Sequence, residues 1–359
     1  MADELAAPAQ PAGRNLAAVL RYAIGILVGC VVLVLLLRRR GEFGAAWHEL
    51  GTASPGWVAA AIGVESLSLL SFAALQRLAL RLSGSVIPLP GLFALSLAND
   101  AIAATVPGEP AVSSAYRYRY YRRRGASGAS AGWTVFTVLI GQAIGMALLL
   151  LAGVLVALAS TNSAAGAGVT VAGLVIVLAA GAVLVRRDLV LRLAGVLVRA
   201  ARRVTGHPRG SIGERIEATL ARMREIPLSR RSTAGLVAIG VAVWGCDFFC
   251  LVCGFRAVHA AIPWHGVLLA YGVAQVAGSF PLIPGGLGIV EGSLSVVLVA
   301  YGVGRVPAVS AVLAYRAVNY WLAMALGWAT AGLLALTLRR RNVAGAHGEA
   351  GRADMTGRI

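Results

Sequence analysis

The chain is built from long apolar stretches separated by short polar ones. A helix needs about 20 mainly apolar residues to cross a bilayer, and six uninterrupted stretches meet that length: residues 16–37, 55–80, 132–159, 164–185, 233–258 and 308–338. Two further apolar stretches, 91–116 and 266–301, are interrupted near their middles. The pattern predicts an all-α, polytopic membrane protein with about six full spans and two broken helical hairpins. Hydropathy alone would count eight spans.

Both interruptions are rich in Pro and Gly, with the sequences VPGEP at 106–110 and PLIPGGLG at 281–288. Such residues end a helix and allow the chain to reverse, so we favour re-entrant hairpins that return to the side from which they came. A full crossing by 91–116 stays open. It would put the three arginines Arg38–Arg40 on the cytoplasmic side, where positive charge is usual.

The interruptions also point to an internal repeat. Pro107 and Pro284 are 177 positions apart, and this offset places 55–80 on 232–257, 91–116 on 268–293 and 132–159 on 309–336. Gly125 falls on Gly302 by the same offset. With two re-entrant hairpins the halves have opposite orientations, which gives an inverted-topology repeat of the kind found in secondary transporters.

The predicted organisation has three parts. Residues 1–15 form a disordered N-terminal tail, 16–338 form the integral membrane domain, and 339–359 form a C-terminal tail. The repeat halves cover about 16–159 and 164–338, with a basic segment at 186–232 inside the second half.

Composition excludes most other classes of protein. Hydrophobic residues make up 58% of the chain and charged residues 13%, against roughly 25% charged in ordinary soluble domains. A water-soluble enzyme, a disulfide scaffold and a disordered chain are therefore excluded. The four cysteines lie within apolar stretches, where small apolar packing is their expected role.

Charge predicts the orientation in the membrane. The net charge is +17, and all 32 basic residues are Arg. Segment 186–232 has 12 Arg against four acidic residues, which marks it as cytoplasmic. The tail after 338 also carries Arg, so we predict a multi-pass protein of the cell membrane with a cytoplasmic C-terminus. The arginines flank apolar spans, so no nucleic-acid partner is expected.

Ionisable residues inside the apolar stretches are costly and mark candidate functional positions. They are Glu65, Asp100, Glu109, Asp247, Arg256, Glu291 and Arg316. Arg316 has two interpretations that the sequence leaves open. Its guanidinium group could make forked hydrogen bonds to a lipid phosphate, or it could form a structural ion pair with Glu291.

The second interruption is a candidate binding element. A helix that begins within the membrane presents unpaired backbone N–H groups, and glycines at 285, 286 and 288 would let a headgroup approach the backbone. A purely structural turn is the alternative. Asn99, Asp100 and Glu109 occupy the corresponding region of the first half.

Three motifs together resemble the lysylphosphatidylglycerol synthase/flippase transmembrane family. The stretch PLIPGGLGIVE at 281–291 is similar to its signature, and LAYR at 313–316 followed by Asn319 and Tyr320 is similar to its last-span motif. A weaker likeness covers VPGE at 106–109, Tyr118-Arg119 and RGAS at 124–127. The resemblance covers roughly 16–338 and implies a lipid-handling or lipid-translocating role.

The resemblance highlights Pro284, Gly285, Gly286, Gly288, Glu291, Tyr315 and Arg316. Bifunctional members of the family carry a soluble synthase domain after the membrane region, whereas here 21 residues follow position 338. Aminoacyl transfer is therefore not expected of this chain. No phosphate-binding loop or hydrolase motif is present in the sequence, so we expect no enzyme activity, cofactor or metal.

These observations lead to one principal hypothesis. The protein is expected to move an amphiphilic, anionic lipid between leaflets, with membrane lipids as its partners. The residues assigned to the translocation site are Asn99, Asp100, Glu109, Pro284, Gly285, Gly286, Gly288, Glu291, Tyr315, Arg316 and Asn319. The alternative is a non-transporting scaffold for an enzyme of lipid or cell-envelope biosynthesis.

Overall fold

A computed structural model describes residues 51–106, 109–160, 168, 171, 173, 229–279 and 284–333, and all regular structure in these ranges is helical. The predicted N-terminal tail, span 16–37, Arg38–Arg40 and the C-terminal tail lie outside them, as do nearly all of span 164–185 and of segment 186–232. The predicted sidedness depends on those segments and stays a prediction.

Four helices are long and apolar enough to cross a membrane. They are α3 (Pro55–Leu82), α6 (Gly128–Ser160), α10 (Arg230–Ala257) and a final helix, Arg305–Leu333. The final helix contains α13 (Arg305–Arg316) and a π-helical turn, η2 (Ala317–Leu322). These helices confirm the polytopic membrane fold and correspond to four of the six predicted spans.

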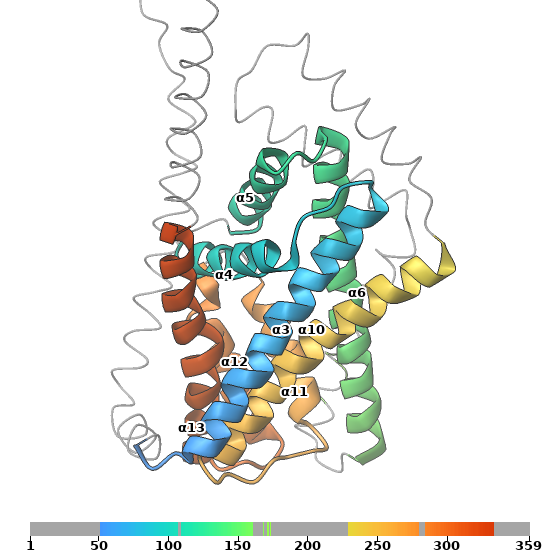
Figure 1. The fold of residues 1–359 in the computed structure, drawn as a ribbon. Helices are drawn as coiled ribbons and strands as arrows, with labels where there is room; N and C mark the ends of the chain where they lie inside the picture. The colour runs from blue at the N-terminus through green and yellow to red at the C-terminus, as the bar shows by residue number, and fades with distance from the viewer. Residues whose placement is uncertain are drawn as a thin grey trace, which may run out of the picture.

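The first broken stretch is a re-entrant hairpin of α4 (Leu89–Thr105) and α5 (Glu109–Arg123). Ser83, at the end of α3, lies with its Oγ 2.5 Å from the Oγ of Ser130 in the first turn of α6. The chain between them therefore leaves and returns on one side of the bundle. Figure 1 shows α4 and α5 together at the upper end of the long helices.

The second broken stretch is also a hairpin whose two ends lie on one side of the bundle. It contains α11 (Val267–Gly278), the short turn η1 (Pro284–Gly286) and α12 (Ile289–Ala300). His265, just before α11, lies with its Nε2 3.2 Å from the carbonyl oxygen of Tyr301, just after α12. In Figure 1 this hairpin lies below α4 and α5, toward the other end of the bundle.

The two halves are inverted copies. Helices α3 and α10 correspond by the 177 offset, yet they run antiparallel, because the Ser54 amide at the start of α3 donates to the Ala257 carbonyl at the end of α10 (2.9 Å). The same offset carries the first residue of α6, Gly128, onto the first residue of α13, Arg305. Helix direction thus confirms the inverted repeat.

The ends of α5 and α12 repeat even their backbone hydrogen bonds. Gly125 and Gly302 both take left-handed conformations, with φ of +93° and +88°. The amide after each glycine bonds back five residues, from Ala126 to Tyr121 and from Val303 to Leu298. This is the Schellman arrangement that commonly ends a helix at Gly, and here it closes both hairpins at equivalent positions.

Small residues bring the long helices close together. A Cβ on Gly145 of α6 would lie 2.5 Å from the backbone of Gly240 on α10, and Gly141, one turn earlier, contacts the same residue. Spacing of this small-xxx-small type supports close helix packing in membranes. The long helices therefore pack closely on one another and beside the hairpins.

Candidate functional site

The candidate site lies where α3 and α10 cross, roughly midway along both helices. Ser54 faces Ala257, and the hydroxyl group of Ser68 donates to the carbonyl of Val243 at 2.9 Å. This register sets Glu65 beside Asp247. Their side chains are 7% and 4% exposed, and the two carboxyl groups lie within hydrogen-bonding range of each other.

Asp247 of α10 accepts hydrogen bonds from α11 and from the last span. Tyr271 and Gln275 of α11 donate to its Oδ2, the amide at 3.0 Å. Tyr315 donates to the same oxygen at 3.0 Å, and Asn319 donates to Oδ1 at 2.6 Å and reaches Glu65 Oε1 at 3.3 Å. One buried carboxylate thereby connects α10 with α11 and the last span.

Helical spacing explains how this cluster forms. Tyr271 and Gln275 are four residues apart on α11, and Tyr315 and Asn319 are four apart on the last span, so each pair shares one helix face. Asn319 lies in the π-helical turn η2. Single π turns within α-helices are frequent at functional sites.

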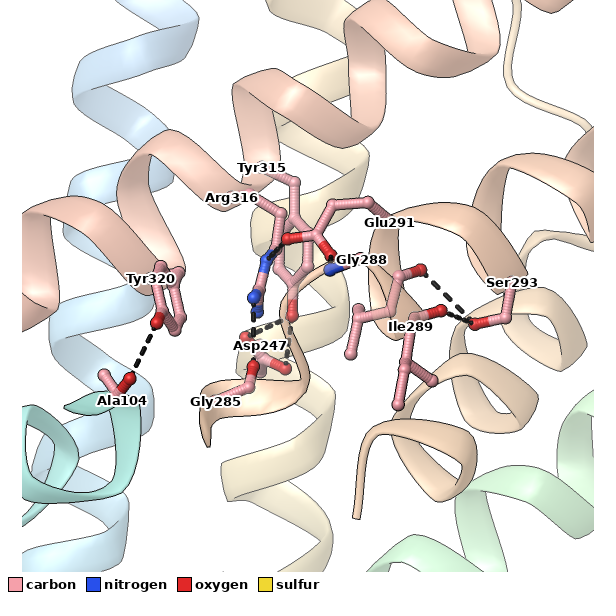
Figure 2. Close-up of polar contacts among 11 residues, drawn as sticks. Ala104, Asp247, Gly285, Gly288, Ile289, Glu291, Ser293, Tyr315, Arg316 and Tyr320 are labelled. Atoms are coloured by element: carbon pink, nitrogen blue, oxygen red, sulfur yellow. Dashed lines mark hydrogen bonds and ion pairs between the residues drawn. The ribbon is translucent and has the colours of Figure 1, made fainter. Parts of the chain in front are cut away.

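A second network surrounds Arg316 (Figure 2). Its Nε lies 2.6 Å from Glu291 Oε1, and its Nη2 donates to the Gly285 carbonyl at 3.1 Å. The guanidinium group lies 4.2 Å from the centre of the Tyr320 ring. The structure therefore contains the Arg316–Glu291 ion pair, one of the two arrangements expected for this arginine.

Glu291 also caps the helix in which it lies. Its Oε2 accepts a hydrogen bond from the Gly288 amide at 2.6 Å, directly before α12. A carboxylate at this position satisfies an unpaired N–H group and interacts favourably with the helix dipole. Glu291 therefore links the N-terminus of α12 to the last span.

The two hairpin interruptions meet at Tyr320. Its hydroxyl group donates to the carbonyl of Ala104, near the end of α4, at 2.8 Å (Figure 2). On the other hairpin, Gly285 has a left-handed φ of +61°, and a Cβ there would lie 2.9 Å from the Tyr320 hydroxyl oxygen. Glycine at 285 thus allows the turn and the close contact with the ring.

Most predicted site residues of the second half come together here. Gly285, Gly288, Glu291, Tyr315, Arg316 and Asn319 all belong to the two networks. Gly286 instead faces the end of α11, where a Cβ would lie 3.1 Å from Gly278 Cα. Pro284 begins η1, and its role in the site stays a prediction.

The predicted site residues of the first half lie on the other hairpin. Asp100 on α4 is in electrostatic contact with Glu65. Asn99 is buried, and within the described ranges its Oδ1 has no hydrogen-bond partner. Glu109 begins α5, and its assignment to the site is not tested.

Sequence reasoning missed part of the site. Glu65 and Asp247 were recognised as costly charges but were not assigned to the site, and Tyr271, Gln275 and Tyr320 were not assigned either. Arg256, named with the same intramembrane charges, lies outside both networks. It is exposed in the last turn of α10, where a cation interacts favourably with the helix dipole.

The family model for the lysylphosphatidylglycerol synthase TM region matches residues 22–327. The chain belongs to this family. The matched range includes both hairpins and both networks, which confirms the resemblance expected from the motifs. A comparison with curated proteins finds no match. Family membership places the protein among membrane proteins of lipid-related processes.

No metal centre is evident in the part of the chain that the structure describes, because no three His, Cys, Asp or Glu side chains there are grouped to hold an ion. Cys246, Cys250 and Cys253 are free thiols, and the last two are buried. The side chains of the two networks offer carboxyl, hydroxyl, amide and guanidinium groups.

Proposed function

We propose that the protein moves a lipid between leaflets by passing its phosphate-bearing, anionic headgroup through the region between the two hairpin interruptions. The observation that carries this proposal is the meeting of two oppositely inserted hairpins at Tyr320, beside a buried Arg316. Family membership supports the lipid as the class of substrate. The inverted repeat supports movement, because many transporters place their sites between such halves.

The Glu291 carboxylate occupies the position that an anionic headgroup would take. It is bound by the Arg316 guanidinium group and by the backbone N–H before α12, and helix N-termini and arginine are both recurrent phosphate binders. A phosphate that displaced Glu291 would gain both donors. Exchange between the internal carboxylate and the lipid phosphate would then give reversible binding.

The outer surface of the bundle offers a place for an acyl chain. A groove of about 490 Å³ lies between α3 and α4, and its walls include Leu67, Leu70, Leu89 and Phe93. The groove begins one helical turn or less from Glu65 along α3. A polar interior beside an apolar surface groove suits an amphiphilic substrate whose tail stays in the bilayer.

The test uses purified protein in liposomes with a fluorescent anionic phospholipid in both leaflets and a membrane-impermeant quencher outside. We expect wild type to expose nearly all of the lipid. Arg316→Lys keeps the charge but loses the forked geometry, and we expect it to slow exchange by about 10-fold to 100-fold, as for a lost charged hydrogen bond of about 1.5–3 kcal/mol.

The matched control is Arg256→Lys, because Arg256 is exposed at the end of α10, and it should exchange lipid at the wild-type rate. Equal rates for Arg316→Lys and wild type would contradict the assigned role. Wild-type vesicles whose inner leaflet stays protected would contradict translocation. They would favour the alternative, a scaffold acting through the basic segment 186–232.

A further inference from the structure

The carboxyl pair of Glu65 and Asp247 has no part in the headgroup exchange described above. The two side chains come from different repeat halves, and both are more than nine-tenths buried. Two ionised carboxylates in contact and away from water repel strongly, and such a pair keeps one proton. Its burial within the membrane-spanning helices therefore needs an explanation beyond packing.

The hydrogen bonds favour the negative charge on Asp247. Asp247 accepts from two hydroxyl groups and two amide groups, an arrangement that stabilises an ionised carboxylate. Among the described residues, Glu65 accepts from Asn319, at 3.3 Å, and the Cys250 thiol lies within hydrogen-bonding range of its carboxyl group. Its Oε2 is buried and has no hydrogen-bond partner among the described residues. A proton on the Glu65 carboxyl group can be donated to Asp247, which lies within hydrogen-bonding range of it.

The groups around the pair do not compete for this proton. Those that face it are Asp100 from α4, Cys246 and Cys250 from α10, Tyr271 from α11, and Tyr315 and Arg316 from the last span. Thiols and phenols ordinarily keep their protons at neutral pH, and arginine keeps its charge. Asp100 adds negative charge, which favours a proton on its neighbour.

We propose that Glu65 and Asp247 form a one-proton binding site that couples lipid movement to the proton gradient. The coupling rests on the proposed function. Binding of one proton gives a neutral Glu65 that donates to an ionised Asp247, so the pair has a charge of −1. Release of that proton to water on the opposite side of the membrane changes the charge of the pair from −1 to −2.

Arg316 transmits this change to the hairpin. It follows Tyr315, which bonds to Asp247, and it interacts electrostatically with Asp247 as well as with its ion-pair partner Glu291. A pair with a charge of −2 attracts Arg316 more strongly. This attraction weakens the ion pair of Arg316 with Glu291 and its hydrogen bond to the Gly285 carbonyl. The proton-bound pair therefore keeps the hairpin interruption closed, and release of the proton opens it to a headgroup.

The first measurement is infrared difference spectroscopy of wild-type protein in lipid nanodiscs during a pH titration. We expect a protonated-carboxyl band at neutral pH that disappears at alkaline pH and is absent in Glu65→Gln. Absence of this band from wild type would overturn the proposal. The wild-type titration decides the question even if a variant fails to fold.

The second measurement uses the liposome assay with and without a pH gradient. We expect the wild-type rate to change by up to about tenfold for each pH unit in the range where the pair titrates, and the rate of Glu65→Gln to lose this response. Tyr121→Phe is the control, because Tyr121 donates to the neutral Gln76 side chain and its loss should leave the pH response unchanged. A Glu65→Gln rate that follows pH as wild type does would overturn the coupling.

Different experimental results would overturn the proposed lipid translocation and the proposed proton coupling. Wild type that exchanges no lipid at any pH would overturn the proposed function and the coupling, while the infrared band would still decide the proton site. Wild type that exchanges lipid at a rate independent of pH would overturn the coupling and leave the proposed function intact.

Discussion

The two hairpins share one fold and differ in chemistry. The first is joined to α3 by a hydrogen-bond network of neutral groups, since Tyr121 donates to Gln76 at 2.6 Å and Gln76 donates to Ser96 at 2.9 Å. The second is held by ionisable groups, through Asp247 on α10 and the Arg316–Glu291 pair. The first network stays within its own half, while the second reaches Glu65 and Ala104 of the other half.

The 177 offset shows that neither network is repeated. Asp247 falls on Leu70 and Arg316 on Leu139, whereas Gln76 falls on Cys253 and Tyr121 on Leu298. The halves have kept their helix order and terminal glycines but differ in which interior side chains are polar. Neutral hydrogen bonds do not change with pH or with a charged ligand, so the first hairpin is suited to a fixed role and the second to a moving one.

The largest expected difference between the hairpins is in stability. Arg316→Met leaves Glu291 without its partner in a partly buried position, and the free energy of unfolding in detergent should fall by about 3–5 kcal/mol. Gln76→Met in the first network should cost about 1–3 kcal/mol, because only neutral groups lose partners.

A double variant sharpens this test. Arg316→Met with Glu291→Gln removes both charges and should recover much of the lost stability, because no uncompensated charge remains. Additive losses in the double variant, or equal losses from Arg316→Met and Gln76→Met, would contradict the distinction between a charged and a neutral hairpin.

Much of the fold was predictable because membrane helices are specified by length and hydropathy. The predicted span 55–80 is α3, and 233–258 differs from α10 by only a few residues. The re-entrant hairpins and the inversion followed from the Pro and Gly interruptions and a single offset. These features depend on the local effects of Pro and Gly on the backbone, which are similar at any position in a chain.

The site was only partly predictable, because its partners are separated by long stretches of sequence. Glu65 and Asn319 lie 254 positions apart, and nothing in the local pattern of either residue indicates the other. The signal that could have found Asp247 was its position opposite Glu65 once α3 and α10 were paired antiparallel. Tyr271 and Tyr320 had no charge to mark them, and tyrosine in an apolar helix usually indicates packing.

Glycine substitutions should have a smaller effect on stability, and this effect should differ between the hairpin interruption at Gly285 and the helix end at Gly302. In Gly285→Ala the alanine takes a left-handed φ, and its Cβ must displace the Tyr320 ring. In Gly302→Ala the alanine takes a similar φ, but no atom lies within 4 Å of the new Cβ. We expect losses of about 1–2 kcal/mol for Gly302→Ala from the backbone alone, and a larger loss for Gly285→Ala. Thermal unfolding in detergent measures both.

The glycine pair also tests where translocation occurs. Gly285→Ala should slow lipid exchange, since Tyr320 joins the two hairpin interruptions, and Gly302→Ala should not. If both variants exchange lipid equally fast after correction for folded protein, the junction at Tyr320 is not on the path.

The smallest expected effect concerns single hydroxyl groups in the two networks. Tyr121→Phe and Tyr315→Phe each remove one hydrogen-bonding oxygen from a fully buried ring, at a cost of about 1 kcal/mol in stability. Their consequences for lipid exchange should differ, because Tyr315 donates to Asp247 and Tyr121 donates to a neutral amide. Tyr315→Phe should slow exchange by about fivefold, the rate equivalent of about 1 kcal/mol, and Tyr121→Phe should leave it unchanged. Slower exchange in Tyr121→Phe would mean that the first hairpin also moves, and the division between a fixed and a moving half would fail.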